Sequence, residues 1–377
     1  MYQKHRISTF DIPLLVLVIA LTSFGIVAIG SATRVNINGF TGEAVSQIIW
    51  LITGLILLFA AAFFDYHTIC GLWIPIYVLN LVLLGAVLLF GSGDGVSRWL
   101  FGIQPSEFAK IFIIISLAKF IDKSEEKINN IDILFAAVAL AGVPFLLVFL
   151  QPSLSASMVI AAITAVLIFC GGLSRKYILV FLAVVIPIGI ILFIDIMSDE
   201  HIILGKFLTD YQISRLVSFL SSDVSGTDPT LYQTKNSIWA IGSGGLKGKG
   251  LYGGTINQLN YLPESHNDFI FSVIGEEFGF IGCLGVIIAL FVIISRCIMI
   301  GAGAADSLGR LLCCGVGGMI AFQTFVNIGV ATGILPNTGM PLPFVSYGGS
   351  SLWVNMTGIG LVLNVGLRRQ KSYGLGF

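Results

Sequence analysis

The first apolar stretch of the chain, D-I-P-L-L-V-L-V-I-A-L-T-S-F-G-I-V-A-I-G-S at residues 11–31, decides the fold class. No charged residue follows Asp11 in it, and as a helix it is long enough to cross about 30 Å of hydrocarbon. The preceding M-Y-Q-K-H-R resembles the start of a secretory signal, but the apolar stretch is too long for one and further apolar stretches follow. We therefore predict a first membrane span that is retained in the protein.

The overall composition is that of a membrane protein. Hydrophobic residues make up 56% of the 377 residues, charged residues only 11%, and the mean hydropathy is +0.96, whereas soluble proteins are about 25% charged. The net charge of zero gives no reason to expect a nucleic acid partner. The six cysteines lie in or beside apolar stretches without zinc-type pairing, so we expect buried thiols rather than disulfides.

Nine more apolar stretches follow, which predicts an all-α polytopic membrane protein with ten transmembrane helices in a single domain, residues 1–377. Pro144 and Pro152 interrupt the fifth and sixth stretches. The ten predicted spans lie near residues 11–31, 44–64, 71–91, 104–121, 131–151, 156–173, 177–196, 267–295, 309–333 and 350–367.

Lysine and arginine residues indicate the orientation, because they concentrate on the cytoplasmic side of membrane proteins. If the N- and C-termini are cytoplasmic, the inner segments carry twelve of these residues and the short outer segments carry only Arg34 and Arg98. The segment 197–266, between the seventh and eighth helices, is then one large extracytoplasmic loop. A loop of about 70 residues usually has a function.

A charged pair stands near the outer end of the fourth predicted span, in S-R-W-L-F-G-I-Q-P-S-E-F-A-K at 97–110. Glu107 and Lys110 are three positions apart and share a helix face. A lone charge at the bilayer centre costs about 2.5–3.5 kcal/mol, and pairing reduces that cost. The pair is therefore either a structural ion pair or one wall of a water-filled cavity for a polar substrate. In the second case Arg98, just outside the span, could grip a phosphate group.

A second cluster of ionisable residues, Glu264, His266 and Asp268, stands in L-P-E-S-H-N-D-F-I-F at 262–271. We expect the eighth span to begin at Asn267, which puts Asp268 in the first helical turn, where backbone N–H groups stabilise an anion. Glu276 would lie about 80° around that helix and deeper, and Glu277 on its far side, so the three carboxylates form no compact site. The residues alone leave Asp268 as either a helix-end charge or a catalyst.

Two irregular segments allow both a structural and a binding interpretation. The glycine-rich A-I-G-S-G-G-L-K-G-K-G-L-Y-G-G at 240–254 fits neither a dinucleotide fold nor a Walker loop. It is either a flexible turn or a backbone cradle that binds an anionic head group together with Lys247 and Lys249. I-L-P-N-T-G-M-P-L-P-F-V-S-Y-G-G-S-S at 334–351 has a rigid backbone and is either a structural loop or one wall of a cavity.

Taken in order along the chain, these segments resemble the SEDS family (shape, elongation, division and sporulation), membrane glycosyltransferases that polymerise peptidoglycan. The resemblance runs from the first predicted span to the last. The motifs that carry it are R-W-L at 98–100, Q-P-S-E-x-A-K at 104–110, Y-Q-x-x-R at 211–215, Y-Q at 232–233, A-I-G-S-G-G-L-x-G-K-G at 240–250, L-P-E-x-H-x-D-F-I-F at 262–271, G-E-E-x-G-F-I-G at 275–282 and N-I-G-x-x-x-G-x-L-P-x-T-G-x-P-L-P-F-x-S-Y-G-G-S-S at 327–351.

The sequence departs from the family pattern at two positions. Ser153 stands where the family commonly has Asp, so no acidic role is carried over to it. Asn267 replaces the usual Thr before Asp268, and Asn also caps helices well. Within the family, G-T-x-x-Q-L at 254–259 and T-G-M-P-L-P-F at 338–344 look like the RodA branch, which builds the lateral wall, rather than the FtsW division branch.

The resemblance implies a glycosyltransferase that polymerises lipid II at the outer face of the bacterial cytoplasmic membrane, with a class B penicillin-binding transpeptidase as partner. Asp268 is then expected to be the general base, and the transfer to invert the anomeric centre. A divalent cation, Mg²⁺ or Mn²⁺, could assist the departing pyrophosphate, although the sequence shows no closed ligand set. The residues expected to bind substrate are Arg98, Glu107, Lys110, Arg215, Lys249, Glu264, His266 and Ser346.

Two other kinds of function remain open at this stage. A lipid II flippase or transporter would also need many spans, a buried charge pair and interrupted helices. A scaffold that only recruits a partner would not need Asp268.

Overall fold

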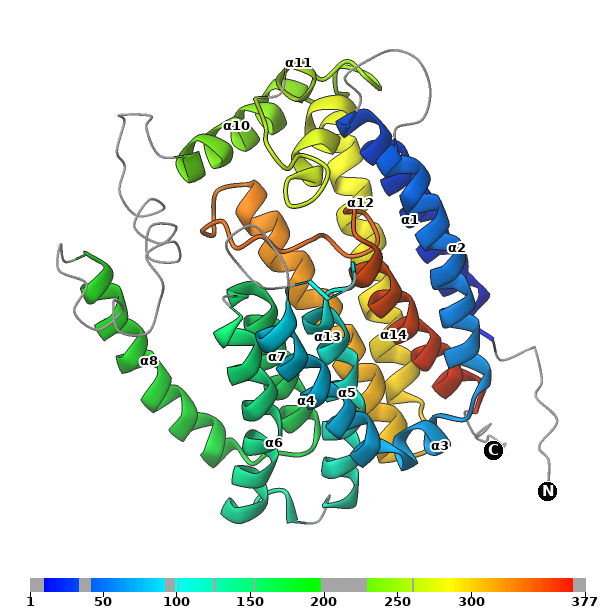
Figure 1. The fold of residues 1–377 in the computed structure, drawn as a ribbon, viewed down its shortest axis with the longest axis vertical. Coiled ribbons are helices and arrows are strands. Elements are labelled where there is room, and N and C mark those ends of the chain that lie inside the picture. Colours follow the sequence, from blue (N-terminus) through cyan, green and yellow to red (C-terminus); the bar gives the residue numbers. More distant parts are fainter. Residues whose placement is uncertain are drawn as a thin grey trace, which may run out of the picture.

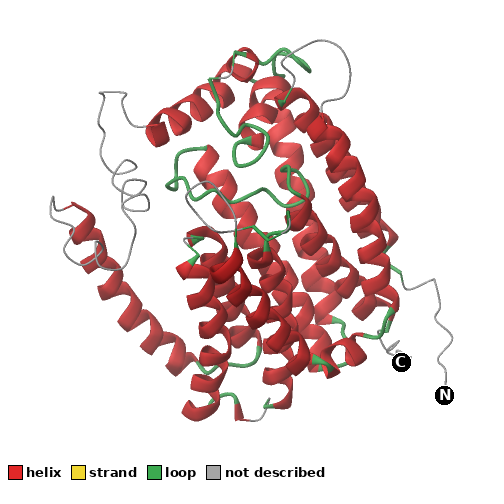
Figure 2. Ribbon diagram, in the orientation of Figure 1, coloured by secondary structure: helices red, strands yellow, loops and turns green. Residues whose placement is uncertain are grey.

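The computed structural model describes residues 10–33, 42–91, 99–100, 102–124, 127–151, 153–197, 229–259 and 261–368. In these ranges the chain is helical and has no strand (Figures 1 and 2). A helix is found at each of the ten predicted positions: α1 (Ile12–Ala32), α2 (Gly42–Phe63), α4 (Trp73–Phe90), α5 (Pro105–Lys123), α6 (Ile131–Leu150), α7 (Leu154–Cys170), α8 (Arg175–Met197), α12 (Ile270–Ala302), α13 (Ser307–Ala331) and α14 (Gly349–Leu367). Three shorter helices are α3 (Tyr66–Gly71), α10 (Pro229–Gly244) and α11 (Thr255–Gln258).

The length and composition of the helices confirm the predicted polytopic membrane fold. Within the described residues, seven helices are long and apolar enough to cross a membrane: α1, α2, α4, α6, α12, α13 and α14. Helix α7 is apolar but shorter, with 17 residues. Helix α5 carries five charged residues among its 19. All six cysteines are free, as predicted.

One detail of the predicted spans is wrong. Pro144 does not interrupt the fifth span, because α6 runs without a break from Ile131 to Leu150 with Pro144 inside it. Proline is tolerated in membrane helices where neighbouring groups satisfy the freed backbone carbonyl. Pro152, which was expected to interrupt the sixth span, lies outside the described residues.

Helices α5, α13 and α14 form the centre of the bundle. Helix α5 packs against α4, α6, α7, α13 and α14, and α13 packs against α5, α7, α12 and α14. The α2–α14 and α12–α13 pairs make the most extensive contacts. In the 18-residue apolar stretches of α13 and α14, 61% and 78% of the residues are buried. In the corresponding stretches of α2, α4 and α6, about a fifth are buried. The outer helices therefore present most of their apolar surface to the membrane.

Helix α12 is broken at Gly279, and the glycine-rich segment fills the break. Gly279 has a left-handed φ of 65°, so regular helical hydrogen bonding cannot continue through it. The carbonyl groups of Glu276 and Glu277 accept hydrogen bonds from the N–H groups of Lys249 and Gly250, at 3.0 and 2.9 Å. On the other side of the break, Phe280 and Ile281 donate to the carbonyl groups of Gly245 and Leu246. The segment thus satisfies backbone groups that the broken helix leaves unpaired.

The close approach of these two backbones explains the glycines. A Cβ atom at Gly248 would lie 2.1 Å from the carbonyl oxygen of Glu277, and one at Gly244 would lie 1.9 Å from that of Gly275. The segment 240–254 therefore packs closely against the backbone of α12.

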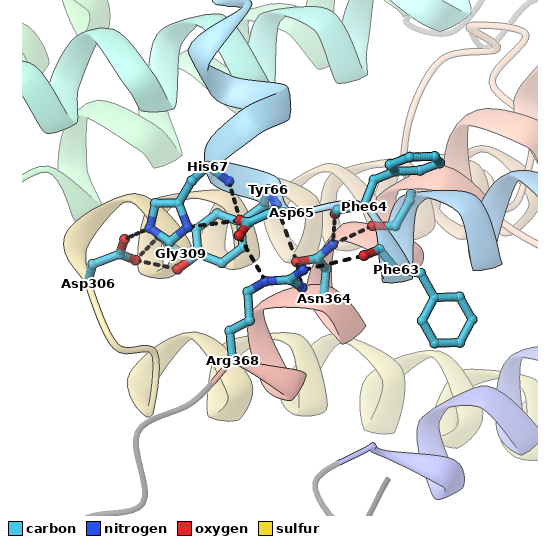
Figure 3. Close-up of polar contacts among 10 residues, drawn as sticks. Phe63, Phe64, Asp65, Tyr66, His67, Asp306, Gly309, Asn364 and Arg368 are labelled. Carbon is cyan, nitrogen blue, oxygen red and sulfur yellow. Dashed lines mark hydrogen bonds and ion pairs between the residues drawn. The ribbon is translucent and has the colours of Figure 1, made fainter. Parts of the chain in front are cut away.

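A polar cluster ties together α3, the connection between α12 and α13, and the end of α14 (Figure 3). The His67 ring lies between Asp65 and Asp306, at 3.0 and 2.7 Å. The Tyr66 hydroxyl donates to Asp306 at 2.8 Å, and Arg368 pairs with Asp65 at 3.4 Å. Since α14 begins at the cavity described below and spans about 28 Å as 19 helical residues, this cluster marks the other end of the bundle.

Candidate active site

A cavity of about 350 Å³ lies where five parts of the chain meet. Its walls come from the outer end of α2, the starts of α5 and α7, the turn before α12, and the segment that leads into α14. Of the residues predicted to act on substrate, Glu107, Lys110 and Asp268 line it. The other lining residues are Trp50, Trp99, Gly102, Gln104, Ser153, Ser155, Ala156, Val159, Asn267, Gly339, Met340, Pro341, Tyr347, Gly348, Gly349, Ser350, Ser351 and Trp353.

The predicted pair of Glu107 and Lys110 forms in the first turns of α5. The Lys110 Nζ atom lies 2.6 Å from Glu107 Oε1, and the two side chains are only 1% and 7% exposed. Proline at the first helical position, Pro105, favours the start of α5 just before them. Among the described residues no group hydrogen-bonds Glu107 Oε2. The pair lines the cavity although both side chains are almost fully buried.

Asp268 lines the cavity. The prediction that it lies in the first turn of a helix is wrong. Helix α12 begins at Ile270 with Phe269 as its N-cap. Asn267 stands two residues before this N-cap, and its side-chain amide donates to Glu264 at 2.6 Å. Asp268 thus precedes the helix. The prediction that N–H groups of the first helical turn stabilise its carboxylate is therefore not the reason for its position.

Long-range hydrogen bonds hold the turn that carries Asp268. The Asn327 side chain donates to the carbonyl groups of Asp268 and Met340, at 2.8 and 2.7 Å. The Ser346 hydroxyl donates to the Asn267 carbonyl at 2.6 Å. The Tyr347 N–H donates to the His266 carbonyl at 3.0 Å. Helix α13 and the segment before α14 therefore fix Asp268 from outside its own element.

Glu264, His266 and Ser346 are not among the residues that line the cavity. Glu264 has a left-handed φ of 54° and accepts the hydrogen bond from Asn267. The His266 ring packs edge-on against Tyr347, with 5.3 Å between ring centroids. The structure places these three predicted substrate-binding residues in the frame around Asp268.

Lys249 is also absent from the cavity lining, and the predicted anion cradle is wrong. Its Nζ atom lies 2.6 Å from Oε1 of Glu276, whose side chain is fully buried. A buried carboxylate needs a counter-charge, which Lys249 supplies. The N–H groups of Gly248, Lys249 and Gly250 all donate to carbonyl groups of the chain itself. They are therefore not available for a head group.

Glu276 and Glu277 have separate partners, and neither lines the cavity with Asp268. Glu276 also accepts from the N–H groups of Ile256 and Asn257. Glu277 accepts from the Ser31 hydroxyl at 2.5 Å. Of the three carboxylates, only Asp268 lines the cavity.

Two predicted phosphate-binding residues, Arg98 and Arg215, lie outside the described residues. The described part of the chain has no group of three or more His, Cys, Asp or Glu side chains that could hold a metal ion. The help expected from Mg²⁺ or Mn²⁺ stays a prediction.

Several lining residues were not foreseen from the sequence. Ser153 and Ser155 bring hydroxyl groups to the cavity from the start of α7, and Trp50 and Trp353 bring indole rings from α2 and α14. Tryptophan near the end of a membrane span is usually an interfacial anchor. The sequence therefore carried no signal that these rings face a cavity.

The chain matches the family model of cell cycle proteins of the FtsW, RodA and SpoVE type over residues 12–371. The chain belongs to this family. The match includes every described residue that lines the cavity, and it confirms the resemblance seen in the ordered motifs. Family membership and the apolar helices together make the protein a multi-span protein of the inner membrane.

Named relatives in the FtsW/RodA/SpoVE family come from more than one branch. The chain is 35% identical to the probable peptidoglycan glycosyltransferase FtsW of Trichlorobacter lovleyi, covering 96% of this chain and 94% of that one. It is 37% identical to the peptidoglycan glycosyltransferase MrdB of Escherichia coli K12, with the same coverage.

Solved structures of the family share the fold. RodA of Thermus thermophilus superposes with a TM-score of 0.69 at 29% identity, covering 96% of this chain and 98% of that chain. A chain of a peptidoglycan synthase complex, described as coordinating polymerization and crosslinking, superposes with a TM-score of 0.77 at 30% identity. That match covers 95% of this chain and 97% of the other.

Proposed function

We propose that this chain is a peptidoglycan glycosyltransferase that polymerises lipid II at the outer face of the membrane. The observation that carries the proposal is the meeting of Asp268 with the buried Glu107–Lys110 pair in one cavity. Relatives named peptidoglycan glycosyltransferase, similar over nearly the whole chain, support the reaction class.

The roles of the three residues follow from the chemistry of glycosyl transfer. Asp268 acts as the general base that takes the proton of the acceptor sugar hydroxyl. A general base must come within hydrogen-bond reach of the hydroxyl group that it deprotonates, and Asp268 lines the cavity that would receive the acceptor sugar. Lys110, positioned by Glu107, stabilises the negative charge that develops on the departing pyrophosphate. Direct displacement with one base inverts the anomeric centre.

Other parts of the proposal concern groups that the structure does not describe. Arg98 and Arg215 would add cationic contacts to the undecaprenyl pyrophosphate. A bound Mg²⁺ or Mn²⁺ would neutralise that leaving group further. Since the described residues offer no cluster of metal ligands, we derive no step through a metal.

We also propose an elongation role with a class B penicillin-binding transpeptidase as partner. The segments 254–259 and 338–344 look like the RodA branch, and one structural neighbour belongs to a peptidoglycan synthase complex. Similarity to FtsW of Trichlorobacter lovleyi keeps the division role as the second candidate. Expression in cells depleted of either RodA or FtsW distinguishes the two: rescue of rod shape supports elongation, and rescue of septation supports division.

Substitution of Asp268 tests the reaction itself. Purified protein with labelled lipid II and its transpeptidase should produce long glycan, and Asp268→Asn should abolish it while the variant remains folded in detergent. Asp132→Asn is the matched control, because Asp132 is an exposed carboxylate in the first turn of α6. Robust polymer from a well-folded Asp268→Asn variant would contradict the assignment of the base.

The competing proposal is a lipid II flippase. Helix α6 runs through Pro144 without interruption, but α12 is broken at Gly279, so broken helices do not distinguish the two functions. In proteoliposomes, the glycosyltransferase should lengthen glycan without moving labelled lipid II between leaflets. Movement of lipid without polymer would favour the flippase.

A further inference from the structure

The cavity has an aromatic wall that the proposed chemistry does not use. Trp50 from α2, Tyr347 from the turn before α14, and Trp353 from α14 all line the cavity, and we call these three residues the aromatic wall. The Trp50 and Tyr347 rings lie 4.9 Å apart between centroids at an angle of 49°. Three of the five tryptophans of the chain, Trp50, Trp353 and Trp99, line this cavity, which is a marked concentration.

The aromatic wall is held rigidly. The Trp353 indole N–H donates to the Thr53 hydroxyl at 2.8 Å, so it is the ring of Trp353 rather than its N–H that remains for a ligand. Trp50 packs directly on the backbone of Gly349, where a Cβ atom would come within 2.8 Å of the ring. Rings fixed in this way lose little conformational entropy when a ligand binds.

The Gln47 side chain fixes the turn that carries Tyr347. The buried Gln47 amide donates to the Ser346 carbonyl and accepts from the Gly348 N–H, both at 3.2 Å. Gln47 and Trp50 lie one turn apart on α2. The same end of α2 therefore supplies both the side chain that fixes the turn and one ring of the aromatic wall. The wall is therefore built into the α2–α14 contact and does not depend on a mobile loop.

The cavity also has a set of polar lining groups beside its other apolar lining residues. The polar groups include the Glu107–Lys110 pair, Asp268 and the hydroxyl groups of Ser153 and Ser155. A ligand that fits both linings must present C–H groups to aromatic faces and hydroxyl groups to polar side chains. A pyranose ring does both. A polyprenyl chain cannot form hydrogen bonds with the polar groups. A pyrophosphate is repelled by the negative faces of aromatic rings.

We propose that Trp50, Tyr347 and Trp353 form a stacking subsite for a sugar ring of the saccharide substrate. This inference rests on the proposed function, since the saccharide is the substrate of that reaction. A cavity of about 350 Å³ is at the small end of ligand pockets. It suits a saccharide unit, with the lipid chains outside it.

Kinetics of wall variants test the subsite. Trp353→Ala and Trp50→Ala should each raise the KM for lipid II about tenfold with little change in kcat, because stacking stabilises bound substrate and transition state alike. Trp353→Phe keeps a ring and should recover most of the loss. The control is Trp239→Ala, since Trp239 is 62% exposed on α10 and absent from the cavity lining. A KM equal to that of the control would overturn the subsite.

A binding measurement separates this inference from the proposed function. Saturation-transfer NMR on the full chain in detergent, with the free disaccharide of N-acetylglucosamine and N-acetylmuramic acid, should show contact between sugar C–H protons and aromatic protons. Asp268→Asn should keep this contact, Trp353→Ala should lose it, and farnesyl pyrophosphate should not produce it. Sugar contact without polymerisation would uphold the subsite and reject the reaction. Polymerisation without sugar contact would reject the subsite and uphold the reaction. The measurement on the unsubstituted protein does not depend on the folding of any variant.

Discussion

The buried pair of Glu107 and Lys110 has a structural and a catalytic role that substitution can separate. Glu107→Gln leaves a charged lysine that is 1% exposed without its partner, so we expect the free energy of unfolding to fall by about 3–5 kcal/mol. In Glu107→Gln/Lys110→Met no buried charge remains, and much of the stability should return while polymerisation stays lost. Thermal unfolding in detergent and glycan synthesis measure the two effects. A double variant that polymerises normally would leave the pair a purely structural role.

Asn327 is the residue that positions Asp268 from a different helix. It is buried and bridges the carbonyl groups of Asp268 and Met340. Asn327→Ala leaves both without this donor, which should cost about 1–3 kcal/mol of stability. A base displaced by about 1 Å should lower kcat about 100-fold with little change in KM. Asn80→Ala is the control, because Asn80 is buried on α4 and its Nδ2 atom has no partner among the described residues. Equal kcat values in the two variants would reject the positioning role.

Helix α12 is broken at Gly279 and depends on the segment 245–250 to pair the backbone groups at the break. Gly248→Ala would place a Cβ atom 2.1 Å from the Glu277 carbonyl, whereas Gly250, with a similar φ of 89°, has open space around its Cβ position. Gly250→Ala should cost about 1–2 kcal/mol for the left-handed backbone alone. Gly248→Ala should cost clearly more and should reduce glycan synthesis, because the segment that closes the break at Gly279 must move. Similar unfolding temperatures for the two variants would show that the close contact does not matter.

Local sequence patterns predicted the positions of the helices well, but they did not predict the long-range contacts between them. Apolar length placed nine of the ten helices within three residues at each end, α12 ends seven residues beyond its predicted end, and three-residue spacing placed Glu107 beside Lys110. The start of α12 was placed three residues too early. The turn there is held by Asn327 and Tyr347, 59 and more residues away. No local pattern could show these contacts, or the packing that turns Trp50 toward the cavity rather than toward lipid.

At the scale of the whole molecule, α13 and α14 connect the two ends of the bundle. Helix α14 begins with Ser350 and Ser351 at the cavity and ends beside Arg368 in the polar cluster of Figure 3. Helix α13 begins after Asp306 in that cluster and carries Asn327 toward Asp268. The polar cluster therefore anchors the two central helices at the end where no cavity residue lies.

Acidification should weaken this anchor. Burial alone raises the pKa of Asp306, but hydrogen bonds from the Gly309 N–H, Tyr66 and His67 outweigh it and hold the pKa below its usual 3.8. A carboxylate whose pKa is lower in the folded than in the unfolded protein stabilises the fold above the unfolded pKa. That stability is lost as the pH falls through the folded pKa, here from about pH 5 downward.

Asp306→Asn should therefore unfold at a lower temperature than the unsubstituted protein at pH 7, and the difference should shrink between about pH 5 and pH 3. Asp65, whose pKa is also lowered by hydrogen bonds from His67 and by Arg368 against the opposing effect of burial, retains part of the acid sensitivity in this variant. Thermal unfolding of the detergent-solubilised chain across this range measures the effect. Asp132→Asn should follow the unsubstituted protein throughout. A constant difference in unfolding temperature between Asp306→Asn and the unsubstituted protein over the whole range would show that ionised Asp306 does not hold the two helices together.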